Sequence, residues 1–125
     1  LQKLHAVPGV TVLPSQVSAE ALEQMYADAD LVLLPYAADV YEYRGSAVLV
    51  EALCSGRQVI ALDGPAFVDQ IRYYGAGTVC RNLGEIADSV IDYSRQSPQL
   101  RFTKARQARQ RFTSETLDNY SRWAR

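Results

Sequence analysis

Residues 31–62 read LVLLPYAADVYEYRGSAVLVEALCSGRQVIAL, and this stretch decides the fold class. The runs Leu31–Leu34 and Gln58–Leu62 are short and apolar, with β-branched residues, as is typical of buried strands. The segment between them ends in a stretch with helical spacing. A strand, a helix and a second strand in this order indicate a βαβ unit, in which the two strands are parallel.

The same alternation continues on both sides of this unit. Further apolar runs occur at Val10–Leu13 and Gly77–Cys80, and segments with helical spacing separate all four runs. Two of the runs are apolar on both faces, as expected of strands that helices cover on both sides. The sequence therefore predicts an α/β fold, with a Rossmann-like parallel sheet of about four strands and flanking helices.

Helix signals surround the predicted strands. Ser18 is a good N-cap for a helix within Val17–Asp28. One face of this helix carries four residues that we expect in the core: Ala21, Leu22, Met25 and Tyr26. After the last strand we expect an amphipathic helix over Leu83–Ser94. A helix from Pro98 to about Arg111 and a last one from Ser114 to Trp123 complete a helical C-terminal end.

Length and composition describe an ordinary folded chain. The 125 residues are 48% apolar and 22% charged, which suits one domain, residues 1–125, and not a disordered segment. The chain begins without Met, on what reads as the tail of a helix, so we expect a partial domain of a longer protein. The formal net charge of −1 offers no overall attraction to nucleic acid, and we expect no nucleic-acid partner.

The cysteines and the apolar runs bear on the cellular setting. Cys54 and Cys80 lack the spacing of metal ligands, so we expect neither a metal site nor a disulfide framework. A reducing, cytoplasmic setting fits this best. No apolar run approaches the roughly 20 residues that cross a bilayer. The basic stretch Arg101–Arg111 fits a solvated helix face, and the alternative is a weak patch for a membrane surface or an acidic partner.

A candidate anion site precedes the helix of the central βαβ unit. The long loop of residues 35–46 follows a strand, at the edge where open α/β sheets bind ligands. Gly45 permits close approach of the backbone, and Ser46 is a good N-cap for a helix that begins at Ala47. The first turn of that helix, which includes Val48, offers unpaired N–H groups and the positive end of a helix dipole, which suit a phosphate.

Glu51 is the one charged residue in the apolar helix Ala47–Ser55, which Gly56 ends. We expect this helix to be buried almost all round, and an unpaired buried carboxylate is costly. Its side chain tilts toward the helix N-terminus, where it is suited to accept hydrogen bonds from a ribose diol. The alternative is a structural role, in which Glu51 pairs with Arg44, Arg57 or a backbone group.

The phrases ADADLVLLPY and YRGSAVLVEALCSGRQVIALD resemble the C-terminal, donor-binding domain of glycosyltransferases with the GT-B fold, of the group 1 or family 4 type. That family carries two glutamates separated by seven residues. Glu51 matches the second glutamate, whereas Tyr43 stands where the first, which contacts the transferred sugar, is expected. The resemblance implies that Glu51 holds the ribose of a nucleoside diphosphate sugar and that the Gly45–Val48 helix start holds the diphosphate. Arg44 then approaches the diphosphate, and Gly64 lies near the donor.

The resemblance also implies what the rest of the protein does. The parent is a transferase that moves a sugar from a nucleotide donor to an acceptor, without a separate cofactor. An N-terminal acceptor domain and a first strand precede this chain, which alone is inactive and holds no identified catalytic residue. Association of the parent with a membrane surface stays open. The alternative is a non-catalytic flavodoxin-like or receiver-like module for regulation or protein binding, although Asp30 and Asp63 do not form a receiver's acidic cluster.

Overall fold

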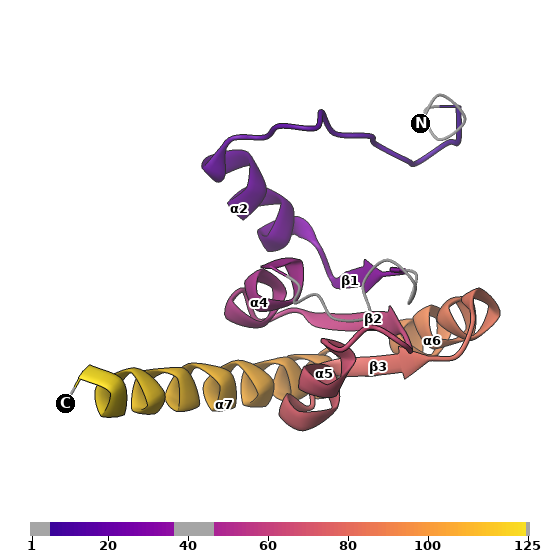
Figure 1. Cartoon of the computed structure of the whole chain (residues 1–125). Coiled ribbons are helices and arrows are strands. Elements are labelled where there is room, and N and C mark those ends of the chain that lie inside the picture. The colour runs from indigo at the N-terminus through magenta and orange to yellow at the C-terminus, as the bar shows by residue number, and fades with distance from the viewer. Residues whose placement is uncertain (1–5, 37–46, 125) are drawn as a thin grey trace.

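The computed structural model describes residues 6–36 and 47–124, which form an α/β fold around a parallel sheet (Figure 1). The strands are β1 (Leu31–Leu34), β2 (Gln58–Leu62) and β3 (Gly77–Cys80), and they lie in the order β1-β2-β3. Both strand pairs are parallel. The three runs that the sequence predicts as strands from Leu31 onward are thus confirmed, with the same bounds.

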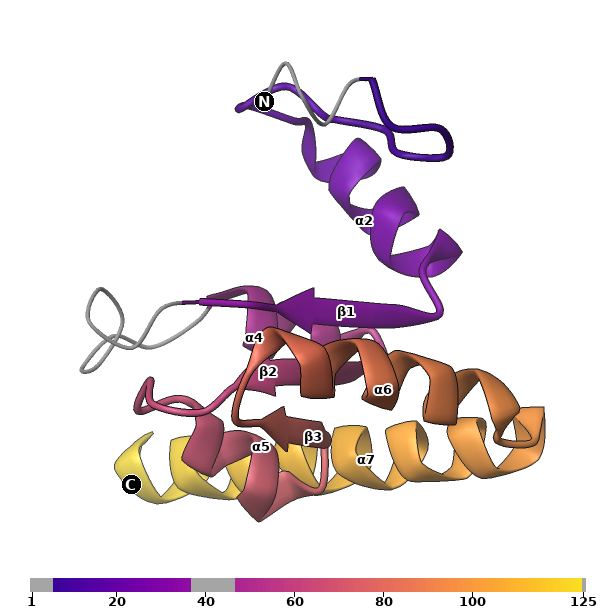
Figure 2. The ribbon, with the colours of Figure 1, turned by 90° about the vertical axis from the view of Figure 1, so that its right-hand side faces the viewer.

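Helices cover both faces of the sheet. The side chains of Val59 and Ala61 pack in a core with α4 (Ala47–Cys54), α5 (Val68–Tyr74) and α7 (Pro98–Ala124). Those of Ile60 and Leu62 point to the opposite face and pack against α6 (Leu83–Arg95). Figure 2 shows α6 on one side of the sheet and α5 and α7 on the other. Because successive residues of β2 face opposite layers, its five residues are apolar or buried throughout.

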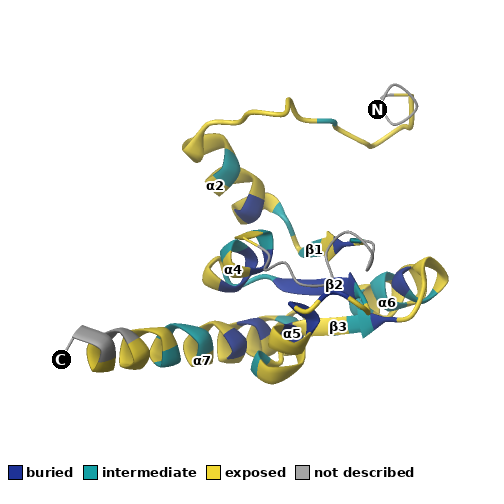
Figure 3. Ribbon diagram, viewed as in Figure 1, coloured by how far each residue is buried: buried dark blue, intermediate teal, exposed yellow. Residues whose placement is uncertain are grey.

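The helix α2 (Ala19–Asp28) precedes the edge strand β1 and touches the core only near its end (Figure 3). Ser18 caps it as predicted, because its hydroxyl oxygen accepts a 3.1 Å hydrogen bond from the N–H of Ala21. The predicted core face is only partly correct. Tyr26 is buried and Leu22 is partly buried, but Ala21 and Met25 are exposed. The helix extends away from the sheet beyond β1, so its upper turns have no layer to pack against.

The predicted strand at Val10–Leu13 is wrong. This segment forms no strand, and Val10 and Leu13 are 42% and 48% exposed. A strand needs a neighbour that accepts and donates the hydrogen bonds of the ladder, and an apolar sequence shows only that a segment suits such a place. The sheet of the described residues therefore has three strands and not about four, with β1 at its edge.

The C-terminal helices differ from the prediction in one respect. The helix α6 is confirmed and begins after Asn82, whose side chain accepts a hydrogen bond from the N–H of Glu85. The two helices predicted after Pro98 are instead one helix of 27 residues, α7, so Ser114 is not an N-cap. The hydroxyl of its neighbour Thr113 donates back to the carbonyl of Arg109 in the preceding turn, and no Gly or Pro interrupts the segment. No helix within the described ranges combines the length and apolar character that crossing a bilayer requires.

Candidate functional site

The predicted site residues that the structure describes lie at the carboxyl edge of the sheet. Ala47 and Val48 begin α4, which follows β1 in the chain, and Gly64 lies in the loop that follows β2. Because β1 and β2 are parallel neighbours, their carboxyl ends share one edge, on the side to which the strand arrows point in Figure 2. The remaining predicted positions lie outside the described residues: Tyr43, Arg44, Gly45 and Ser46.

The helix α4 is buried on one face only. Leu49, Ala52 and Leu53 are buried in the core, whereas Ala47, Val50 and Cys54 are exposed. The expectation of a helix buried almost all round is therefore wrong, because the described residues pack against one side of it. Gly56 ends the helix with a left-handed backbone (φ 69°), as predicted.

The Glu51 carboxylate is half-buried and is held by a tyrosine. Its Oε2 accepts a 2.8 Å hydrogen bond from the hydroxyl of Tyr26, which comes from α2. The predicted alternative partner Arg57 is directed elsewhere, because its guanidinium donates to the backbone carbonyls of Tyr26 and Ala27 at 2.9 and 3.0 Å. Among the described residues Glu51 makes no ion pair. A salt bridge with Arg57 is thus excluded in this structure, and Arg44 lies outside the described residues.

The surroundings of Tyr26 keep its hydroxyl protonated. Its side chain is 4% exposed, and burial raises the pKa of the phenol, as does the hydrogen bond to Glu51. The negative charge of Glu51 and the nearby Tyr36 raise the pKa further. A neutral phenol donates to a carboxylate without neutralising it. One oxygen of the Glu51 carboxylate therefore has a neutral hydroxyl as its hydrogen-bond donor.

The loops after β1 and β2 meet next to this pair. Tyr36 follows the carboxyl end of β1, and its ring packs edge-on against Phe67, from the segment after β2, with ring centres 5.8 Å apart. Phe67 is buried in the same core as Tyr26. Between β2 and Phe67, Gly64 is exposed, and its N–H donates to the Asp63 carboxylate at 2.9 Å. Tyr36 and Phe67 thus pack together at the carboxyl edge of the sheet, and Gly64 is exposed in the loop between β2 and Phe67.

The contact between Tyr26 and Glu51 was not anticipated from the sequence. One feature of the sequence does favour this contact: a buried tyrosine on the apolar face of a helix needs a hydrogen-bond partner for its hydroxyl. The carboxylate of Glu51, itself in an apolar helix, has the same need. Two such residues, each predicted to be buried, can satisfy each other by a hydrogen bond, although they lie 25 positions apart in the sequence.

A separate hollow lies at the opposite, amino edge of the sheet. It measures about 520 Å³, and polar residues contribute to its lining, including Gln58, Thr78, Asp92, Gln96 and Lys104. Gln58 is the first residue of β2 and Thr78 is the second residue of β3, so this hollow does not coincide with the predicted site. No group of three His, Cys, Asp or Glu within residues 6–36 and 47–124 lies close enough to hold a metal ion.

Comparison with known proteins adds no identification. No model of a known protein family matches the chain, and a comparison with curated proteins also gave no match. The resemblance to the glycosyltransferases therefore rests on the sequence phrases around Leu31–Leu34 and Glu51.

Proposed function

We propose that this chain is the donor-nucleotide-binding part of a sugar-nucleotide-dependent glycosyltransferase with the GT-B fold. The observation that carries the proposal is the set of partners around the Glu51 carboxylate. Its carboxylate is oriented by a neutral hydroxyl, and no cation among the described residues neutralises it. A half-buried charge of this kind is costly unless a ligand uses it, and ribose hydroxyls are suitable donors.

Each predicted residue has a role in this proposal. Glu51 accepts hydrogen bonds from the two ribose hydroxyls with the oxygen that Tyr26 does not occupy. The diphosphate lies at the start of α4, where Gly45, Ser46, Ala47 and Val48 supply backbone N–H groups. Arg44 contacts the phosphate oxygens through its planar guanidinium. Tyr43 and Gly64 border the sugar end of the donor.

The chemistry that this arrangement supports is departure of a nucleoside diphosphate. The N–H groups and the positive dipole end of α4 stabilise the negative charge that develops on the leaving phosphate. The donor is a substrate, and no separate cofactor takes part. In the parent enzyme an N-terminal domain supplies the acceptor site, and this chain contributes the position of the donor.

Titration with nucleotides tests the proposal. We expect UDP or GDP to bind the chain, and Glu51→Gln to weaken binding at least about tenfold, since charge-assisted hydrogen bonds contribute about 1.5–3 kcal/mol. Calorimetry measures the affinities. Glu23→Gln is the matched control, because it removes the same charge from an exposed position on α2.

Two results would contradict the proposal. One is nucleotide binding that Glu51→Gln leaves unchanged. The other is a parent gene without a second Rossmann-like domain upstream of Leu1. A chain that binds no nucleotide and has no such parent is better explained as a non-catalytic α/β module of the flavodoxin or receiver kind.

A further inference from the structure

A second hollow lies where the end of α4 meets α7. It measures about 270 Å³ and is lined by Ser55, Gly56, Arg57, Phe102, Arg106 and Arg109. The side chain of Arg109 lies across Gly56, since a methyl group at that glycine would be 3.8 Å from its Cδ. Three arginines from two separate segments therefore surround one space, which we call the arginine hollow.

None of these three arginines has a carboxylate partner among the described residues. Other arginines of the same structure do: Arg72 pairs with Asp63, Arg81 with Glu85, and Arg111 with Glu115. The first acidic residue of α7 is Glu115, so the turns that carry Arg106 and Arg109 have no carboxylate of their own. Within the described ranges no ion pair offsets the charges of Arg106 and Arg109, whereas Arg57 donates to two backbone carbonyls.

An adjoining hollow is lined by a fourth arginine. It measures about 190 Å³ and shares Gly56, Arg57 and Phe102 with the arginine hollow, and Arg101 also lines it. The Nε of Arg101 is buried and has no hydrogen-bond partner within the described part of the chain, and its guanidinium lies 5.2 Å from the centre of the Tyr93 ring. Asp30 lines this second hollow too, but it makes no ion pair with Arg57 or Arg101. A buried N–H without an acceptor is costly, and Arg101 adds a further positive charge next to the arginine hollow.

We propose that the arginine hollow binds a phosphate group. Guanidinium groups match phosphate oxygens two at a time, and Arg106 and Arg109 line this space together beside Arg57, which also donates to backbone carbonyls of α2. The end of α4 adds only about half a negative charge, which three full positive charges outweigh. Phe102, whose side chain is 66% exposed, lies at the rim beside the arginines.

The arginine hollow is distinct from the proposed donor site. It lies at the end of α4, whereas the donor diphosphate is proposed at the start of that helix. Eight helical residues at 1.5 Å each separate the two places by about 12 Å. The inference does not depend on the glycosyltransferase proposal, and the two can fail separately.

Nuclear magnetic resonance with pyrophosphate tests the inference. We expect pyrophosphate to shift the backbone amides of Gly56, Arg57 and Phe102. The double variant Arg106→Gln/Arg109→Gln should weaken this response at least about tenfold, since it removes two charge-assisted partners.

The double variant Arg95→Gln/Arg122→Gln is the matched control. It removes two exposed arginines from other positions, so its net charge equals that of Arg106→Gln/Arg109→Gln. It should bind pyrophosphate as the wild type does. Equal loss in the control, or an unchanged response in Arg106→Gln/Arg109→Gln, would overturn the inference. Circular dichroism confirms that both variants remain helical.

Vesicles distinguish the source of the phosphate. Cosedimentation with phosphatidylcholine vesicles that contain phosphatidic acid, lost in Arg106→Gln/Arg109→Gln but kept in the control, would indicate a lipid headgroup. Pyrophosphate binding without cosedimentation would indicate a soluble phosphate. Failure of the wild type to respond to either probe would contradict a phosphate site.

Discussion

The hydroxyl oxygen of Tyr26 lies 2.8 Å from Oε2 of Glu51, and this hydrogen bond joins α2 to α4. A second connection lies nearby, where Arg57 donates to the carbonyls of Tyr26 and Ala27. Most other residues of α2 are exposed. The attachment of α2 to the sheet therefore depends largely on the burial of Tyr26 and on these polar contacts.

Tyr26→Phe should lower the free energy of unfolding by about 1–2 kcal/mol, because it leaves a half-buried carboxylate without its donor. Urea denaturation measures the change. Tyr73→Phe is the matched control: its hydroxyl also donates to a carboxylate, that of Glu115, but its side chain is 51% exposed. We expect the control to cost less than about 0.5 kcal/mol. Equal effects of the two substitutions would show that burial of the bond is unimportant.

Stability should fall at alkaline pH, in part because of Tyr26. Burial, followed by the contact with Glu51, raises the pKa of Tyr26 above its ordinary value of about 10. The neutral phenol is thus favoured in the folded state, and its stabilisation is complete below pH 10. It is lost as the pH rises from there toward the folded-state pKa. Above pH 10 the unfolding free energy should fall by up to about 1.4 kcal/mol per pH unit more in the wild type than in Tyr26→Phe.

Urea denaturation at a series of pH values between 8 and 11 checks this difference. Burial also raises the pKa of Tyr74, so Tyr26→Phe should keep part of the alkaline loss. Parallel curves for the wild type and Tyr26→Phe would contradict the assigned role of Tyr26.

Arg57→Met should loosen α2 and leave the sheet intact. It removes two hydrogen bonds that a charged group donates to carbonyls at the end of α2, each of which contributes about 1.5–3 kcal/mol. Hydrogen exchange should become faster in the amides of α2 and stay unchanged in β2. Arg72→Met is the control, since its ion pairs with Asp63 and Asp69 are exposed and contribute little. Faster exchange throughout the chain would instead indicate a general loss of stability.

Gly77→Ala should be strongly destabilising, by about 3 kcal/mol or more. A methyl group at Gly77 would overlap the backbone of Val59, with its carbonyl carbon only 2.7 Å away, so β2 and β3 would have to separate. Gly75→Ala is the comparison, because nothing lies within 4 Å of a methyl group there and its cost comes only from the positive φ of 65°. Thermal denaturation should show a cost of about 1–2 kcal/mol for Gly75→Ala. A milder effect at Gly77 than at Gly75 would contradict the close approach of the two strands.

The sequence predicted the elements that depend on local chemistry. Leu31–Leu34, Gln58–Leu62 and Gly77–Cys80 form strands because each run is apolar and follows a helical segment. Ser18 and Gly56 begin and end helices because a hydroxyl acceptor and a left-handed backbone are needed at those points.

The features that were not predicted depend on partners distant in the chain. Val10–Leu13 has a sequence suited to a strand but no neighbour with which to form a ladder. Glu51 was recognised as an unusual carboxylate, but its partner Tyr26 is specified by how α2 packs on α4 and not by spacing. Ser114 shows a third limit, because a good N-cap is also tolerated within a helix.

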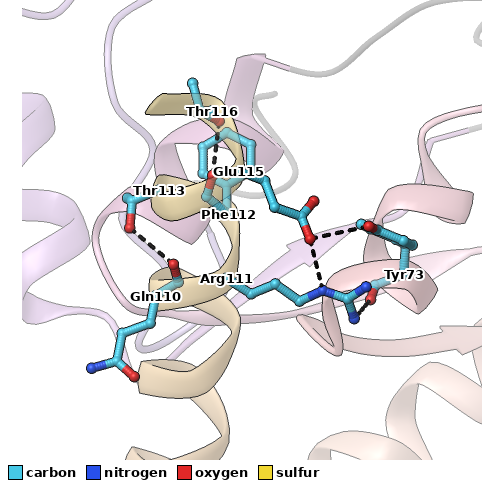
Figure 4. A network of polar contacts seen from close by, with 7 residues as sticks. All are labelled: Tyr73, Gln110, Arg111, Phe112, Thr113, Glu115 and Thr116. Atoms are coloured by element: carbon cyan, nitrogen blue, oxygen red, sulfur yellow. Dashed lines mark hydrogen bonds and ion pairs between the residues drawn. The ribbon is translucent and has the colours of Figure 1, made fainter. Parts of the chain in front are cut away.

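Near its C-terminal end, α7 contacts α5 through Arg111, Phe112 and Glu115, which meet Tyr73 and Tyr74. Figure 4 shows Arg111, whose guanidinium lies 3.9 Å from the centre of the Tyr73 ring and also bonds to Glu115, which accepts from the Tyr73 hydroxyl. The next four side chains, Thr116 to Asn119, are all exposed. At 1.5 Å per residue, about 14 Å of helix continues beyond Glu115 to the end of α7 at Ala124. The direction of the far turns of α7 therefore depends on the contacts that Arg111 and Glu115 make with Tyr73.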